Sequence, residues 1–359
     1  MYEPEFTITQ EILSNIGRIE AAKEVIENAP LVPIYEARFV SDALNRTVHH
    51  STHLEGNDLT LQEAKKIIEG ENIVARTRDV QEVINYRNVL KHLDGLEKDL
   101  REGWQYDPDV LGKINEIVCD RLIDPGQLGV FRSVQAILKD DQSGEIVFRP
   151  PPAVEVPYLL EDFFAWLNSV EGKKIHPVLR AGIAHYYLVA VHPFVEGNGR
   201  SARTFATLVL FAENYDIKKF FSLEEYFDKD SAQYYQALFD VDTSHSDSDI
   251  GSRDLTPWLE YFTQAMAIEL TRIKEKVKQL SLDVKIKRQI GHQVPLKERQ
   301  MKIMEYLEAN GSMTTAEARV AVPGYSDDSL VRDFNYLLNK GLLRKVGKTK
   351  SARYCLKKS

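Results

Sequence analysis

The segment from His192 to Arg203 constrains this chain more than any other stretch. It reads His-Pro-Phe-Val-Glu-Gly-Asn-Gly-Arg-Ser-Ala-Arg and combines an imidazole, a carboxylate, a glycine-containing turn and two cations. The residues from 201 to 210 have the composition of a helix, and the first turn of a helix has unpaired N–H groups. A glycine turn before such a start lets several N–H groups converge on one anion. The segment therefore predicts a site for a polyphosphate.

The side chains of this segment suit separate tasks. Arg200 and Arg203 can each donate a planar pair of hydrogen bonds to phosphate oxygens. Glu196 would be repelled by phosphate unless a divalent cation lay between them, which favours Mg²⁺. His192 follows the apolar run 178–191, which we expect to be helical, and an imidazole at such a corner can take a proton from a hydroxyl. A lone histidine there is more often a buried helix cap, but its neighbours favour a general base.

The segment resembles the signature of the Fic family, His-x-Phe-x-Asp/Glu-Gly-Asn-Gly-Arg-x-x-Arg, and every fixed position is filled. In that family the histidine activates a Ser, Thr or Tyr hydroxyl of a target protein, which attacks the α-phosphate of ATP. The resemblance implies a protein adenylyltransferase that uses ATP and Mg²⁺. By the same resemblance His192 is the catalytic base, Phe194 a core anchor and Glu196 the magnesium ligand, and the remaining nucleotide-binding residues are Gly197, Asn198, Gly199, Arg200, Ser201 and Arg203.

A second motif lies N-terminal to the signature. Gly56 and the asparagine after it predict the end of a helix expected over residues 35–50, so Glu55 lies near a helix C-terminus, where a negative charge is disfavoured. Alone, such an acid is usually exposed. Ser51-x-x-x-Glu55-Gly56, however, resembles the inhibitory motif of many Fic proteins. The resemblance implies that Glu55 pairs with Arg203 and blocks productive binding of the ATP γ-phosphate.

Two β-rich runs precede the signature. Residues 129–138 and 145–149 flank a polar turn and predict a hairpin, which alone could be a structural corner. Its position resembles the Fic flap, which lies over the active site and binds a target segment through the main chain. Val147 and Phe148 are therefore the candidates for contact with substrate.

A tyrosine pair lies on the helix expected over residues 228–238. Tyrosines at such a place usually pack in the core. The family has a matching helix beside the adenine, so the resemblance implies that Tyr235 contacts the base and that Tyr234 lies next to it.

Three histidines lie close together in the N-terminal part of the chain. His49 and His53 have the i,i+4 spacing of helical metal ligands, and His50 lies between them. No third ligand stands nearby at a zinc spacing, so the sequence disfavours a metal site here.

The remaining pattern predicts a mainly α fold with a second, smaller domain. We expect an N-terminal helical region at 1–105, a Fic core at 106–280, a linker at 281–296 and a last domain at 297–359. Other helices are expected at 8–28, 59–70, 85–101, 111–118 and 158–167, and a long one from 255 to 280.

The last domain resembles a winged helix of the DNA-binding type. We expect helices at 297–310, 314–320 and 327–339, followed by a two-stranded wing. The third helix carries Asp327 and Asp328, which oppose an approach to phosphates, whereas the wing is basic. DNA binding and protein docking both stay open.

The composition of the chain limits which partners and which cellular location we expect. A net charge of −8 argues against non-specific nucleic-acid binding by the whole molecule. The two cysteines, Cys119 and Cys355, cannot form a disulfide framework. Since no apolar signal segment or membrane span is evident, we expect a cytoplasmic protein.

Three hypotheses follow. The first is an adenylyltransferase inhibited by Glu55, and the resemblance also implies self-modification and a homodimer. The second is an enzyme that removes AMP or transfers another phosphate-linked group. The third is a winged-helix regulator whose core only senses nucleotide, which an intact His192 disfavours.

Overall fold

The structure is a computed structural model that describes residues 2–31, 33–96, 104–139, 146–243, 250–290, 296–323, 325–347 and 352–357. The chain divides into two compact units. Unit 1 comprises Met1–Glu27 and Glu36–Ile273, and unit 2 comprises Asn28–Tyr35 and Lys274–Ser359. Every residue expected to act in catalysis lies in unit 1.

Unit 1 is mainly helical, which agrees with the expected fold class. Its α-helices, of which α2 begins and α12 ends in unit 2, are α1 Gln10–Glu27, α2 Pro33–His53, α3 Leu61–Ile68, α4 Thr77–Leu96, α5 Pro108–Cys119, α6 Val156–Asn168, α7 Val170–Lys174, α8 Pro177–Val191, α9 Asn198–Ala212, α10 Leu223–Lys229, α11 Ser231–Thr243 and α12 Thr256–Ile290. Among the described residues, no helix is both long and apolar enough to cross a membrane.

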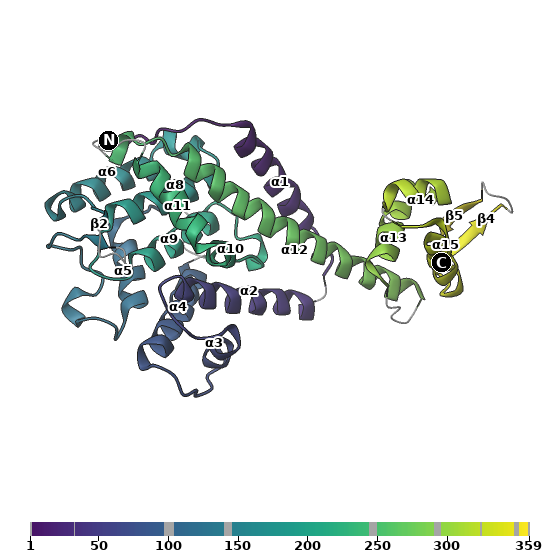
Figure 1. Cartoon of the computed structure of the whole chain (residues 1–359), viewed down its shortest axis with the longest axis horizontal. Coiled ribbons are helices and arrows are strands. Elements are labelled where there is room, and N and C mark those ends of the chain that lie inside the picture. Colours follow the sequence, from purple (N-terminus) through teal and green to yellow (C-terminus); the bar gives the residue numbers. More distant parts are fainter. Residues whose placement is uncertain are drawn as a thin grey trace. The chain divides into compact units, whose positions relative to one another are not determined.

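Helices α8 and α9, which flank the signature loop, pack side by side in the middle of unit 1 (Figure 1). Nearly every residue of α8 is buried. Helix α12 packs closely against it at Gly182, where a Cβ would clash with Leu259 and Phe262, and Trp258 Nε1 donates to the Gly182 carbonyl at 2.8 Å. The core therefore fixes both helices that carry the candidate catalytic residues.

Helix starts follow the local sequence closely. Thr60 caps α3 through a reciprocal capping box with Glu63, as its residue type predicts. Asp107 caps α5, and a proline occupies the first turn of that helix.

Several expected helix boundaries are wrong. Residues 77–96 form the single helix α4, so the start expected at residue 85 is wrong, whereas residues 97–101 of the expected helix lie outside the described part. The helix expected at 228–238 is two helices, because Asp230 leaves the helical conformation and caps α11 by accepting from the Gln233 N–H at 3.0 Å. Helix α12 continues past residue 280 to Ile290, since the next glycine is Gly291.

The expected hairpin is present but its first strand is short. Leu138–Lys139 (β1) pairs antiparallel with Ile146–Phe148 (β2), and the residues from 140 to 145 lie outside the described part. The strand expected to begin at residue 129 is wrong up to residue 137. Here the backbone of Gly129 lies against that of Gly112, and the N–H of Arg132 donates to the Pro193 carbonyl at 2.8 Å. These contacts hold the segment against α5 and the loop that follows α8 in place of strand pairing.

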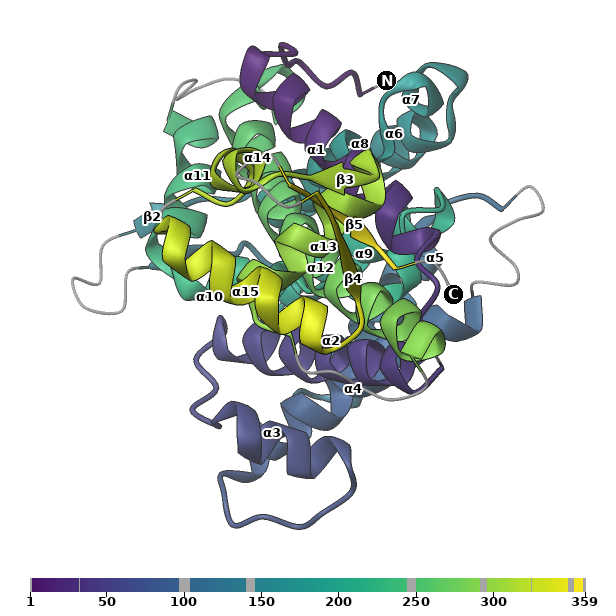
Figure 2. The same cartoon turned by 90° about the vertical axis from the view of Figure 1, so that its right-hand side faces the viewer.

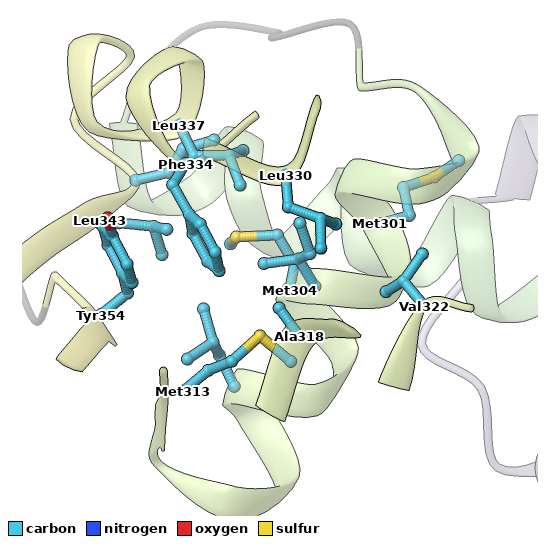
Figure 3. Packing of buried hydrophobic residues seen from close by; sticks show 13 residues of the cluster. Met301, Met304, Met313, Ala318, Val322, Leu330, Phe334, Leu337, Leu343 and Tyr354 are labelled. Atoms are coloured by element: carbon cyan, nitrogen blue, oxygen red, sulfur yellow. The ribbon is translucent and has the colours of Figure 1, made fainter. Parts of the chain in front are cut away.

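Apart from the start of α2 and the end of α12, the described residues of unit 2 form three helices and a three-stranded antiparallel sheet in the order β3-β5-β4 (Figure 2). The elements are α13 Glu298–Asn310, β3 Ser312–Met313, α14 Thr315–Ala321, α15 Asp327–Asn339, β4 Leu343–Val346 and β5 Arg353–Leu356. The three helices and the β4–β5 hairpin agree with the expected pattern, to which β3 is an addition. Buried side chains from all three helices meet those of the sheet in one core (Figure 3).

Candidate active site

His192 lies at the corner where α8 ends. Its φ of 50° and ψ of 59° are left-handed, and its N–H still donates to the Leu188 carbonyl at 3.1 Å. A non-glycine residue adopts this conformation only where surrounding contacts stabilise it.

Arg132 supplies such contacts. The buried guanidinium donates from Nε to the His192 carbonyl at 2.7 Å and from Nη2 to the Pro151 carbonyl at 2.6 Å. Because one planar group bonds several carbonyls, it fixes the chain segments that carry them. Sequence reasoning missed Arg132, since its partners are backbone groups distant in the chain and belong to no motif.

The environment of His192 keeps its imidazole neutral. The pKa of His192 is lowered to about 4, mainly by burial and also by the charge of Arg132, whereas the Val189 carbonyl and Glu55 act in the opposite direction. A neutral imidazole is the form that can accept a proton.

The glycine turn leads directly into α9. This helix begins at Asn198, three residues before the expected start, with Gly197 as its N-cap at a φ of 75°. A side chain at Gly197 would be strained and would collide with Cys119. Asn198 accepts from the N–H of Phe194 and donates to its carbonyl, both at 2.9 Å. The Asn198 side chain thus closes the loop, and Phe194 is buried as expected.

Arg200 is buried at the start of α9. Its Nη2 lies 3.2 Å from Glu196 Oε1, and its Nη1 lies 3.5 Å from Glu82 Oε1. Its Nε and Nη1 make no hydrogen bond to any residue that the structure describes. Buried donors without acceptors are costly, so these atoms favour an anionic ligand.

Glu196 stands between two cations. Its partly exposed carboxylate also accepts from Arg78 Nη2 at 3.1 Å. One carboxylate holds Mg²⁺ well only when other oxygens complete the coordination, as phosphate oxygens commonly do. The donor set therefore fits a magnesium ion that binds together with a nucleotide.

Arg203 is buried and bonded to the end of α2. Its Nη2 donates to Glu55 Oε1 at 2.7 Å and to the Ser51 carbonyl at 2.9 Å, and its Nε donates to Ser51 Oγ at 2.9 Å. The fold thus brings Ser51 and Glu55 onto the arginine with which the sequence associated them. Gly56, in the same turn, has a φ of 87°.

The charge of Glu55 interacts with His192, Arg200 and Arg203 of the signature. Burial of the Glu55 carboxylate raises its pKa. The charges of Arg203 and Arg200, with a smaller effect of His192 in the same direction, outweigh burial, so the pKa of Glu55 is lowered. A Cβ at Gly199 would collide with Glu55 Oε1. The carboxylate therefore occupies the space over the first turn of α9 on which the histidine and both arginines converge.

The two tyrosines of α11 have different surroundings. Tyr234 is buried, and its hydroxyl lies 3.1 Å from His185 Nε2. Tyr235 is half exposed, and its hydroxyl donates to the Leu54 carbonyl at 3.0 Å. Tyr234 is thus a core residue, and Tyr235 contacts the turn that carries Glu55.

The flap residues are only partly described. Phe148 is half buried at the end of β2. Val147 belongs to the same strand, but its side chain lies outside the described part.

Two further polar residues support the site without being predicted. Glu82 is buried, accepts from Asn57 Nδ2 at 2.9 Å and faces Arg200. Asn115 Nδ2 donates to the Glu196 carbonyl at 2.9 Å and to Ser201 Oγ at 3.2 Å. Each is a single polar residue within a helix, so the sequence alone carries no signal for them beyond the apolar face that they interrupt.

Comparison with known proteins agrees with this arrangement. Residues 105–210 match the Fic/DOC family. Two curated relatives, each called protein adenylyltransferase Fic, come from Drosophila willistoni (27% identical over 219 residues, 58% of this chain and 41% of the relative) and Drosophila grimshawi (29% over 185 residues, 50% and 35%). The alignments thus span less than half the length of these relatives.

Two solved structures share the fold. A Fic family protein from Desulfovibrio desulfuricans G20 has a TM-score of 0.62 at 21% identity, and the alignment covers 100% of this chain and 99% of that one. A Fic domain containing signaling protein from Bacteroides thetaiotaomicron has a TM-score of 0.61 at 22% identity, over 75% of this chain and 97% of that one. The chain therefore carries a Fic/DOC family domain at residues 105–210.

Proposed function

We propose that this protein is an adenylyltransferase that moves AMP from ATP to a Ser, Thr or Tyr hydroxyl of a protein, and that Glu55 inhibits it. The name of the curated relatives supports the activity. The observation that carries the proposal is the position of Glu55, whose carboxylate accepts from Arg203 Nη2 at 2.7 Å and lies against Gly199 in the first turn of α9.

In the proposed reaction, the neutral imidazole of His192 takes the proton of the target hydroxyl. The hydroxyl oxygen then forms a bond to the α-phosphorus of ATP. The bond from that phosphorus to the bridging oxygen breaks, and pyrophosphate leaves with the electron pair. Arg132 holds the corner on which His192 lies, so the base is positioned before substrate arrives.

The start of α9 would bind the phosphates. Its free N–H groups and positive dipole end favour an anion, and the buried Arg200 offers Nε and Nη1 as donors. Glu196 would hold Mg²⁺ together with phosphate oxygens, and the ion would supply neutralisation of phosphate charge. Gly197 keeps the loop close to the ligand.

Glu55 would inhibit by occupying Arg203 and by placing negative charge where the γ-phosphate binds. The ion pair is largely shielded from solvent, since the side chain of Arg203 is 2% exposed and that of Glu55 is 25% exposed. Poorly screened charges of like sign repel strongly, so a bound triphosphate and this position of Glu55 exclude each other.

Labelled ATP tests the proposal. Wild type, Glu55→Gly and Glu55→Gly/His192→Ala are incubated separately with ATP labelled at the α- or the γ-phosphorus, with the chain itself and a cell lysate as acceptors. We expect α-label on protein, more of it with Glu55→Gly, and none in the double variant.

The other outcomes separate the alternatives. Transfer of γ-label indicates a kinase, and loss of AMP from an already labelled protein indicates removal of AMP. Absence of label from every nucleotide, with DNA retained in a gel shift, favours a winged-helix regulator. Label that is unchanged in Glu55→Gly rejects inhibition by Glu55.

The role of unit 2 is a separate proposal. Its helix and strand order is that expected of a winged helix, and the exposed Arg344 and Lys345 lie on β4. At the start of α15, however, Asp327 bonds to Arg319, and Asp328 is exposed. DNA and a protein partner stay alternative ligands, and the homodimer and cytoplasmic location remain predictions.

A further inference from the structure

A cluster of imidazoles and one carboxylate lies outside the proposed catalytic groups. The histidine cluster consists of His49, His50 and His53 at the end of α2 and of Asp228 in α10. The sequence offered no third ligand near these histidines, but the fold brings one from 178 residues away. One potential ligand atom from each of His49, His50 and Asp228 lies within 4.8 Å of the others.

The cluster is held together by short contacts. Asp228 Oδ2 lies 2.6 Å from His50 Nδ1, and Asp228 Oδ1 lies 2.7 Å from His53 Nδ1. The carboxylate is 7% exposed, so it is fixed between two imidazoles and largely withdrawn from water. Such an oriented carboxylate is ready to act as a ligand.

His49 differs from the other two histidines in the surroundings of its Nδ1 atom. Its Nδ1 is buried and makes no hydrogen bond to any residue in the described ranges. Its ring centroid lies 4.6 Å from that of His50 and 5.6 Å from that of His53. A buried polar nitrogen without a hydrogen bond is costly, and an imidazole nitrogen in this position can serve as a metal ligand.

We propose that His49, His50 and Asp228 form a binding site for a divalent transition-metal ion, with Zn²⁺ as its occupant. Two imidazoles and a carboxylate are a common zinc ligand set and leave the fourth position to water. His53, bonded to the other oxygen of Asp228, orients the carboxylate from outside the ligand set.

The geometry requires a small adjustment. Ligand atoms about 2.0–2.1 Å from a tetrahedral zinc ion lie about 3.3 Å apart. The His50 and Asp228 atoms, now 2.6 Å apart, would therefore separate by about 0.7 Å as the ion replaces the proton between them. Since the ligand atoms of the whole set lie within 4.8 Å of one another, the widest pair would have to approach by at most about 1.5 Å, through rotation of the side chains.

An ion at this place would connect α2 to α10 directly beside Ser51 and close to Glu55. It would therefore favour the position in which Glu55 reaches Arg203. This consequence rests on the proposed inhibition by Glu55, whereas metal binding itself does not.

The test measures binding and requires no transfer activity. The full chain is stripped with a chelator and titrated with Zn²⁺ by calorimetry, and bound Co²⁺ is followed by its visible absorption. The variants are Asp228→Asn and His50→Gln, which nearly preserve shape, and Glu196→Gln is the control for binding at the nucleotide site. Circular dichroism and thermal unfolding verify that each variant is folded.

We expect one Zn²⁺ per chain and a tetrahedral Co²⁺ spectrum for wild type and Glu196→Gln. Affinity should fall at least tenfold in Asp228→Asn and His50→Gln. Failure of wild type to bind one equivalent overturns the site, and so does wild-type affinity in either cluster variant. Loss of binding in Glu196→Gln alone would place the ion at the nucleotide site instead.

Discussion

The buried imidazole of His192 predicts how transfer depends on pH. Burial lowers its pKa to about 4, so the proton acceptor persists well below the ordinary value of 6.5. In Glu55→Gly, we expect kcat/KM for ATP to change by less than about twofold between about pH 5.5 and 7 on account of this group. Initial rates of α-label transfer at each pH measure it, and an acid limb centred at pH 6.5 or above contradicts it.

The lowered pKa of His192 also determines how the stability of the fold changes with pH. Between pH 6.5 and about 4 the unfolded chain protonates this histidine while the folded chain does not. The free energy of unfolding therefore falls as pH is lowered through this window.

Arg132→Lys tests whether the corner itself matters. A lysine ammonium cannot bond the His192 and Pro151 carbonyls in the same planar arrangement. We expect kcat of Glu55→Gly to fall at least tenfold with little change in KM for ATP, because the base moves and the phosphate groups do not. A lower unfolding temperature together with a higher KM for ATP would instead indicate a purely structural role.

At the residue scale, the sequence identifies the candidate site residues that form a contiguous motif. His192, Glu196, Arg200 and Arg203 were assigned from their match to the Fic signature, and the structure places them around one loop and helix start. Arg132 was not predictable, because it acts through backbone carbonyls that only the folded chain brings to it. The residue types of a motif thus indicate its chemistry, but they do not indicate which distant residues position it.

At the scale of elements, α11 supports the turn at the end of α2 that carries Glu55. The Tyr235 hydroxyl donates to the Leu54 carbonyl at 3.0 Å, one residue before Glu55. The turn is therefore fastened both by the Glu55–Arg203 ion pair and by this hydrogen bond.

Tyr235→Phe removes that hydrogen bond and keeps the ring. A hydrogen bond of this kind contributes about 0.5–1.5 kcal/mol, so we expect basal transfer to rise roughly two- to tenfold. In Glu55→Gly the same substitution should raise transfer no further, because the inhibitor is already absent. Rates of self-labelling in the four proteins of this cycle measure the coupling, and an equal effect in both backgrounds would contradict it.

Helix identity was predictable and helix ends were less so. Periodicity found α1, α2 and α15, whereas the break at Asp230 depends on a cap that competes with a continuous helix. The strand expected over residues 129–137 was predicted wrongly for a related reason. Its residues bond to the end of α8 instead of to a strand, which local propensity cannot register.

At the scale of the whole molecule, the chain has two separate sets of buried contacts. The core of unit 2 includes Phe334, whose ring stacks on that of Tyr354 with centroids 3.9 Å apart (Figure 3). The sequence predicted a separate last domain from its own helix pattern, but the helix that continues through residues 281–290 was not foreseen.

Phe334→Ala tests whether unit 2 unfolds independently. Removing a fully buried phenylalanine costs about 3–5 kcal/mol, so the unfolding transition of unit 2 should move to a clearly lower temperature. The transition of unit 1 and the transfer activity of Glu55→Gly should stay unchanged, because the catalytic residues and their buried contacts belong to unit 1. Val331→Ala, a partly exposed position on the same helix, is the control and should shift unfolding by about 0.5 kcal/mol or less. Calorimetry resolves the two transitions, and a joint shift of both would show that the units unfold as one cooperative body.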